Sequence, residues 1–159
     1  MKPLVLLATL ALLAGCQAGR PRDYVPTIAR FYFESTDASS AAVELPRSGV
    51  RLSLAAAPAF SEGDIVNVEL VQVELGRCLL FELTTAAARD LYRLSVANQG
   101  RRLVLTLNGA AFGARRIDGP IADGRAFVFV EMADESLPAL VQSLKQTSAE
   151  IQRAAARKK

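Results

Sequence analysis

The chain offers few groups that could do covalent or metal chemistry. It contains no His among its 159 residues, which removes Ser–His and Cys–His nucleophile pairs and imidazole metal ligands. Two Cys cannot build a four-cysteine zinc site, and no phosphate-loop or dinucleotide-binding motif is present. The acidic pair Asp134-Glu135 precedes an expected helix, where negative charge is favourable. We therefore expect no enzyme, no catalytic or metal-binding residues, no cofactor and no small-molecule substrate.

The Cys16 thiol is the group with the clearest chemical role. It follows Lys2 and an apolar run over residues 4–14, which is shorter than the ~20 residues that a membrane-spanning helix needs. The run ends Leu13-Ala14-Gly15-Cys16, which resembles the lipobox of bacterial lipoproteins. The resemblance implies cleavage between Gly15 and Cys16 and a lipid on Cys16. The alternative is an ordinary secretory signal followed by a chance Cys.

The residues after Cys16 predict a location and a tether. Gln17 replaces the Asp that retains some lipoproteins in the inner membrane, which favours the outer membrane with the domain facing the periplasm. Gly19, Pro21 and Pro26 argue against regular structure in residues 16–26. A flexible segment of this length spans roughly 20 Å, so we expect the domain to lie close to the membrane surface.

Residues 27–152 predict one α+β domain: a mixed, mostly antiparallel sheet of about six strands, one packed helix and a C-terminal helix. At its centre, Thr84 or Thr85 begins a helix that ends at Gly100. Alternating Leu residues then predict a strand over residues 102–107, and Asn108-Gly109 predicts a tight hairpin.

Three finer expectations concern the sheet. The apolar residues of 64–75 change parity, which predicts a β-bulge near Leu70. Gly76-Arg77 is expected to form the turn into the next strand. Residues 126–131 are apolar on both faces and are expected inside the sheet.

The central block also resembles the head part of the first periplasmic domain of SecD, an accessory subunit of the bacterial Sec translocase. The residues that carry the resemblance are Leu83-Thr84, Ala88, Asn98, Gly100-Arg101, Leu103-Val104-Leu105, Leu107-Asn108-Gly109, Pro120-Ile121 and Gly124. They fall within residues 64–130. This chain has Gly113-Ala114-Arg115 where SecD typically has Ser-Ala-Pro. Because no transmembrane bundle follows, the resemblance implies a shared module and not the translocase motor.

The charged residues suggest partners. A formal net charge of +3 is too small to indicate nucleic acid. Arg101, Arg102, Arg115 and Arg116 fall on neighbouring hairpin strands and form a candidate basic patch for anionic lipid headgroups or acidic segments; the alternative is a solvated strand face. Cys78 is interpreted as a buried apolar residue, the alternatives being a partner disulfide or a redox sensor.

Two functions follow from these observations. The first is a non-enzymatic, membrane-anchored lipoprotein whose SecD-head-like module binds exported polypeptides or an envelope protein by adding a strand to an open sheet edge. The second is a structural lipoprotein that links the outer membrane to the cell wall through its basic tail, residues 153–159.

Overall fold

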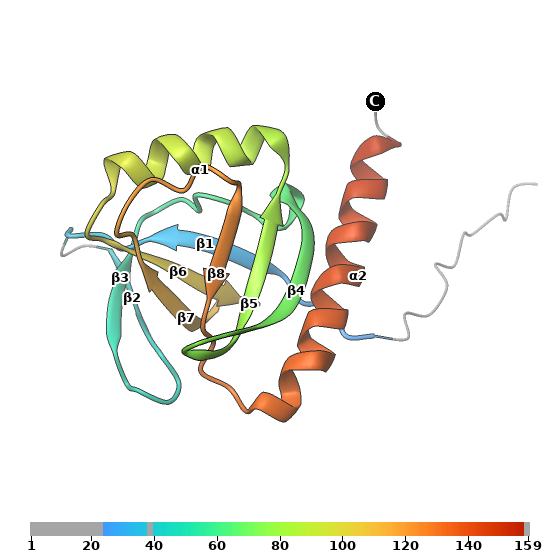
Figure 1. Cartoon of the computed structure of the whole chain (residues 1–159), viewed down its shortest axis with the longest axis horizontal. Helices are drawn as coiled ribbons and strands as arrows, with labels where there is room; N and C mark the ends of the chain where they lie inside the picture. The colour runs from blue at the N-terminus through green and yellow to red at the C-terminus, as the bar shows by residue number, and fades with distance from the viewer. Residues whose placement is uncertain (1–23, 38–39, 158–159) are drawn as a thin grey trace, which may run out of the picture.

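A computed structural model describes residues 24–37 and 40–157 (Figure 1). The predicted lipobox and most of the tether lie outside these residues. The strands are β1 (Ala29–Phe33), β2 (Ala41–Glu44), β3 (Arg51–Leu54), β4 (Ile65–Val73), β5 (Gly76–Leu83), β6 (Arg102–Leu107), β7 (Ala110–Arg116) and β8 (Arg125–Val128). The helices are α1 (Thr85–Ala97), α2 (Leu137–Ala156) and two short 3₁₀ turns, η1 (Glu62–Asp64) and η2 (Asp134–Ser136). Neither long helix of this described part is apolar enough to span a membrane.

The strands form three small antiparallel sheets, in the orders β1-β6-β7, β2-β3 and β4-β5-β8. Single bridges, Glu34–Leu54 and Gly113–Val130, join the first sheet to each of the others. The predicted α+β class is confirmed. The prediction of a single sheet of about six strands was wrong. The strands form three sheets, because only single bridges, and not continuous hydrogen-bonded pairing, connect one sheet to the next.

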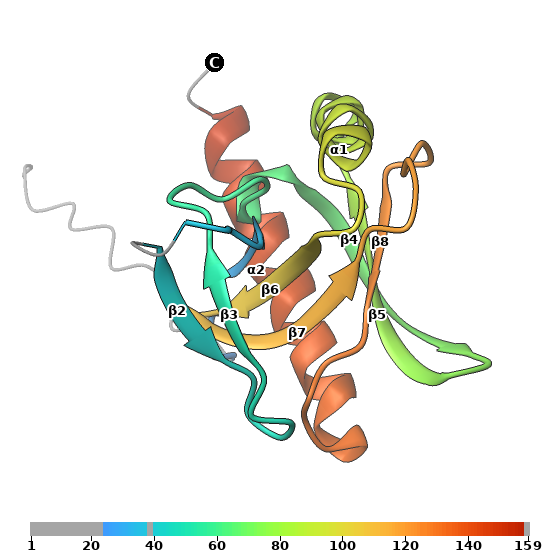
Figure 2. The same ribbon diagram turned by 90° about the vertical axis from the view of Figure 1, so that its left-hand side faces the viewer.

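The β1-β6-β7 sheet has apolar residues on both faces. Leu103 and Leu105 of β6 lie in the main core, together with Phe31, Phe81 of β5 and Leu91 of α1. On the opposite face, Val104 and Ala111 form a second core with the β2–β3 hairpin, which lies across this sheet in Figure 2. This double coverage explains why all of Leu103–Leu107 is buried.

The central helix and hairpin form as predicted. The Thr84 hydroxyl caps α1 by accepting a hydrogen bond from the Ala87 N–H at 3.3 Å. Asn108 and Gly109 both have positive φ, 49° and 89°, as a type I′ turn requires. The helix therefore passes directly into the β6–β7 hairpin that carries the site described below.

The three finer expectations about the sheet were wrong in detail. The register irregularity in β4 lies between Ile65 and Asn67, not near Leu70. The strand keeps its register at Leu70. The apolar residues change parity there because Val71 lies on the other face of the sheet, opposite the buried Cys78. The turn between β4 and β5 is formed by residues 74–75, and Gly76 already belongs to β5. Residues 126–131 lie at the end of their sheet rather than inside it.

Candidate functional site

The outer edge of β1 is closed by the chain that follows β3. The Phe31 N–H donates to the Phe60 carbonyl at 2.9 Å, the Ala59 N–H to the Phe31 carbonyl at 2.7 Å, and the Ala55 N–H to the Phe33 carbonyl at 2.9 Å. Phe60 is buried, with its ring edge-on to Phe31. No further strand can add to this part of β1.

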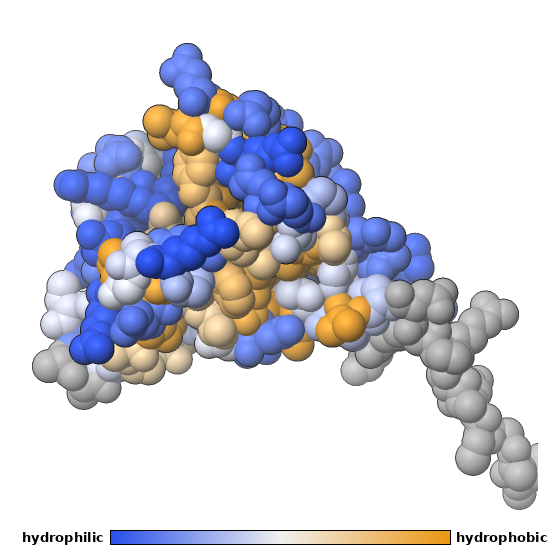
Figure 3. All heavy atoms as spheres, turned by 90° about the horizontal axis from the view of Figure 1, so that it is seen from below, coloured by the Kyte–Doolittle hydropathy of each residue, from blue (hydrophilic) through white to orange (hydrophobic). Residues whose placement is uncertain are grey.

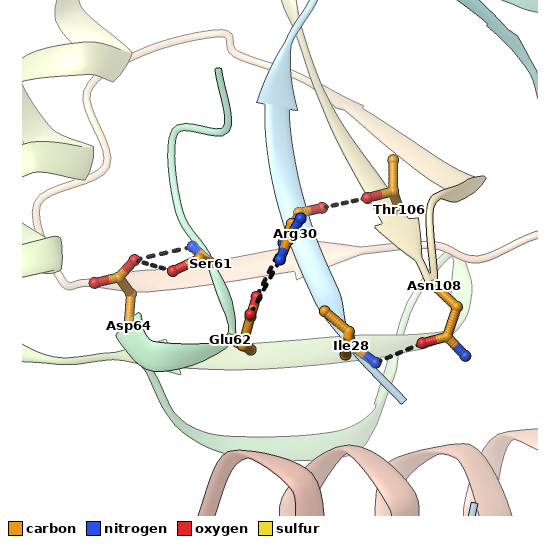
Figure 4. A network of polar contacts seen from close by, with 7 residues as sticks. All are labelled: Ile28, Arg30, Ser61, Glu62, Asp64, Thr106 and Asn108. Atoms are coloured by element: carbon orange, nitrogen blue, oxygen red, sulfur yellow. Dashed lines mark hydrogen bonds and ion pairs between the residues drawn. The ribbon is translucent and has the colours of Figure 1, made fainter. Parts of the chain in front are cut away.

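Side chains fasten β1 on both sides, Glu62 at its outer edge and Thr106 and Asn108 on the side of β6 (Figure 4). Arg30 donates two hydrogen bonds to the Glu62 carboxylate, at 3.1 and 3.2 Å, and this contact lowers the pKa of Glu62. The Asn108 side chain accepts from the Ile28 N–H at 2.8 Å, and the Thr106 hydroxyl donates to the Arg30 carbonyl. The edge of β4 is covered differently, because α2 lies along it and Gln152 donates to the Ile65 carbonyl.

The outer edge of β7 is closed over only half its length. Gly113 bridges Val130, and the Glu131 N–H donates to the Phe112 carbonyl at 2.7 Å. A side chain at Gly113 would not fit, since a Cβ there would lie 2.3 Å from the Phe129 carbonyl oxygen. Beyond this crossing, no ladder joins β7 to β8 in the described part of the chain. We call the space between residues 114–116 of β7 and residues 125–129 the notch.

The backbone of β7 faces the notch with unshared polar groups. The Ile117 N–H donates to the Arg101 carbonyl at 2.9 Å, toward the β6 side of the hairpin. Because backbone groups alternate along an antiparallel strand, those of Ala114 and Arg116 are directed away from β6. The Ala114 N–H faces the Phe129 carbonyl at the Gly113–Val130 crossing, so the groups that face the notch are the Ala114 carbonyl and the backbone groups of Arg116. This is the arrangement to which an extended peptide can add as a further strand.

Beside this edge lies a groove of about 500 Å³. Val73, Phe127 and Phe129 provide its apolar lining, and Arg115, Arg116 and Asp118 its charged lining. Phe127 stands opposite the buried Leu80 of β5, while 39% of Phe129 is exposed. Figure 3 shows a band of apolar atoms framed by hydrophilic ones on the face seen from below. The groove therefore suits apolar side chains of a bound segment.

The four predicted patch arginines do not form one cationic surface. Arg102 and Arg116 stand directly opposite each other, but Arg102 pairs with Glu34 at 3.0 Å and Arg116 with Asp118 at 3.5 Å. Arg101 donates to the Asn98 side chain at 3.4 Å and does not line the groove. Only Arg115 and Arg116 reach the notch.

Cys78 is a fully buried, free thiol, as interpreted from the sequence. Burial raises its pKa, and the nearby positive charge of Arg115 opposes that rise. Sequence reasoning missed Phe127 and Phe129, because a run that is apolar on both faces reads as an interior strand. The residue that signals the crossing is Gly113, because only a residue without a side chain allows Val128 and Phe129 to pass so close to β7.

A larger hollow, of about 720 Å³, lies along the outer side of α1, where it is lined by Ala88, Arg89, Tyr92 and Ala122. Apart from Ala122, its lining residues belong to α1, so its walls offer no strand edge. Among the described residues no group of three His, Cys, Asp or Glu side chains could hold a metal ion. The notch is therefore the stronger candidate.

No protein-family model and no curated protein matches this chain. The chain does match solved structures. One is a structure of SecDF, described as a membrane component that enhances protein export, with a TM-score of 0.60 and 16% identity. That match covers 76% of this chain and 62% of the other. SecDF in a super-membrane-facing form matches with a TM-score of 0.61 and 16% identity, over 75% of this chain and 18% of the other.

A third match is SecDF from Thermus thermophilus, a translocon-associated membrane protein, with a TM-score of 0.51 and 18% identity. It covers 78% of this chain and 19% of the other. The chain thus spans less than two thirds of each matched protein. The resemblance predicted from the central block is confirmed for the fold: the described domain is folded like a part of SecDF.

Proposed function

We propose that this chain is a non-enzymatic lipoprotein of the bacterial envelope, and that its SecD-like domain binds extended segments of exported polypeptides. The observation that carries the proposal is the notch, where an unpaired half of β7 borders an apolar groove. A strand edge supplies affinity through backbone hydrogen bonds that do not depend on sequence, and adjacent pockets supply selectivity. A protein that handles many exported chains needs this combination.

The similarity to SecDF, described as enhancing protein export, supports the choice of exported polypeptides over other ligands. Lipid on Cys16 would hold the domain close to the membrane from which such chains emerge. We further propose the outer membrane as the anchored location, on the basis of Gln17.

Site-specific photocrosslinking in intact cells tests the binding function. A photoreactive phenylalanine analogue replaces Phe129 in the full chain, and a second variant carries it at Val50; the two side chains are equally exposed, at 39%. Cells that accumulate an exported precursor should give an adduct with that precursor from position 129 and not from position 50. Equal adducts from both positions, or none, would refute the proposal.

The strand-addition geometry has its own test. Arg116→Pro removes the N–H directed at the notch, whereas Arg116→Gln removes the charge and keeps the N–H. A proline is tolerated on a strand edge where the N–H is not bonded within the sheet. Crosslinking from position 129 should fall in the Pro variant and persist in the Gln variant. Equal loss in both variants would mean that the charge of Arg116, and not the edge, binds the ligand.

The lipid anchor is tested by metabolic labelling with palmitate. The wild-type chain should take up label and fractionate with the outer membrane. Cys16→Ser should lose the label and fractionate with soluble periplasmic proteins. Label that survives this substitution would contradict the anchor.

A further inference from the structure

Arg115 differs from the other three patch arginines in having no internal partner. Arg102 pairs with Glu34, Arg116 pairs with Asp118, and Arg101 is bonded to Asn98. Arg115 makes no ion pair or side-chain hydrogen bond with any other residue of the described part of the chain. Its five N–H donors are therefore available to a ligand.

The position of Arg115 is unusual for an arginine without a partner. It stands directly opposite Leu103, which is fully buried, so it lies on the core face of the sheet near the end of the β6–β7 hairpin. Arg115 is partly buried, lines the apolar groove and is close enough to the buried Cys78 to affect its thiol. Water screens a charge less effectively in such surroundings than on an open surface.

A positive charge at a partly buried residue without an acidic partner is stabilised when a ligand neutralises it. A carboxylate is the matching group, because a guanidinium can donate two parallel hydrogen bonds to its oxygens. The adjacent Phe127 and Phe129 require apolar groups on the same ligand. The unpaired edge of β7 requires backbone donors and acceptors, which a polypeptide has and a fatty acyl chain lacks.

We propose that the notch selects extended polypeptide segments in which an acidic side chain, flanked by apolar residues, binds Arg115. This inference rests on the polypeptide-binding function proposed above and adds the chemistry of the segment. Side chains on one face of a strand recur every second residue, roughly 7 Å apart. An acid opposite Arg115 therefore places its two nearest same-face neighbours along the groove.

The test uses the full chain purified in detergent and three labelled peptides. The peptides alternate Val and Thr and differ only at one central residue, which is Glu, Gln or Lys. Binding is measured by fluorescence anisotropy, with detergent alone as the blank. One charge-assisted bond is worth about tenfold in affinity, so the Glu peptide should bind about tenfold more tightly than the Gln peptide, and the Lys peptide more weakly still.

Arg115→Gln should remove the preference for Glu over Gln, while the exposed control Arg101→Gln should keep it. Arg115→Glu should reverse the order, so that the Lys peptide binds best. Reversal requires a direct contact, because a variant that merely misfolds would lose all three peptides.

The remaining outcomes separate this inference from the function on which it rests. If all three peptides bind equally to every variant, the polypeptide-binding function stands and the role of Arg115 is refuted. If no peptide binds the wild-type chain, the function itself is refuted. If decanoate, added below its micellar concentration, displaces the Glu peptide as effectively as unlabelled peptide does, the ligand is a fatty acid and the proposal is overturned.

Discussion

β1 and β7 are the two outer strands of the same three-stranded sheet, yet their free edges differ. The edge of β1 is bonded by residues 55–60, is sealed by Phe60 and is fastened by the Arg30–Glu62 ion pair. The edge of β7 is bridged only at Gly113. Beyond that residue β8 does not pair with β7, and the edge that carries Arg115 and Arg116 has no neighbouring strand. Whether an edge is open is thus decided by the segment that passes beside it and not by the strand itself. The closed edge contributes stability, and the open edge is free for binding.

The largest expected effect comes from removing the residue that seals the closed edge. Phe60→Ala should lower the free energy of unfolding by about 3–5 kcal/mol, because Phe60 is 2% exposed and its loss leaves a cavity beside Phe31. Phe129→Ala at the notch is the matched change and should cost less than about 1 kcal/mol. Urea unfolding followed by circular dichroism measures both. Similar losses would mean that the notch is part of the core.

The crossing at Gly113 should be the next most sensitive position. Gly113→Ala places a methyl group within 3 Å of both the Phe129 carbonyl oxygen and the Val128 side chain, so β8 must move. We expect a loss of about 1–3 kcal/mol. Gly119→Ala, where nothing lies within 4 Å of the added Cβ, should stay within about 0.5 kcal/mol of the wild type. Equal stability of the two variants in urea would contradict the close crossing.

The ion pair on the closed edge predicts a modest pH dependence. Arg30 holds the pKa of Glu62 below its ordinary value of 4.5, mainly through their hydrogen bonds. The stabilisation is therefore complete above the unfolded pKa and is lost as the pH falls through the lower, folded pKa. Because Arg30 is 44% exposed, we expect less than about 1 kcal/mol.

Unfolding free energies measured from pH 6 down to pH 3 test this dependence. Glu62→Gln should be less stable than the wild type at pH 6 and should approach it in acid. A constant difference across that range would contradict the linkage.

The smallest effects are expected from two arginines that face each other. Arg102 pairs with Glu34 beside β1, where both side chains are partly covered, whereas Arg116 and Asp118 are 71% and 82% exposed. Arg102→Gln should cost up to about 1 kcal/mol, and Arg116→Gln about zero. Relief of the like-charge contact offsets part of each loss. Thermal unfolding measures both variants, and a larger cost at Arg116 than at Arg102 would contradict this order.

The sequence predicted the parts of this fold that depend on local chemistry. Thr84 as a helix cap, Asn108-Gly109 as a hairpin, and Cys78 as a buried residue each follow from local conformational or apolar preferences. The division into three sheets did not follow, because it depends on where distant segments cross. The same limit applies to the site: Arg115 and Arg116 were identified by their charge. The partner that occupies Arg102 is Glu34, which lies 68 residues earlier in the chain and could not be assigned from the sequence.

The N-terminal segment is held against the last helix before β1 begins. The Thr27 N–H donates to the Thr147 hydroxyl at 3.0 Å, the Thr27 and Ser143 hydroxyls are 2.8 Å apart, and the Ser143 hydroxyl donates to the Val25 carbonyl. A mechanical pull on this segment would therefore act on these three small hydroxyl contacts with α2 before it reached the sheet. Only after these gave way would the load reach β1, whose five register pairs with β6 run along the strand. The contacts with α2 would act as a weak mechanical link that yields before the sheet does.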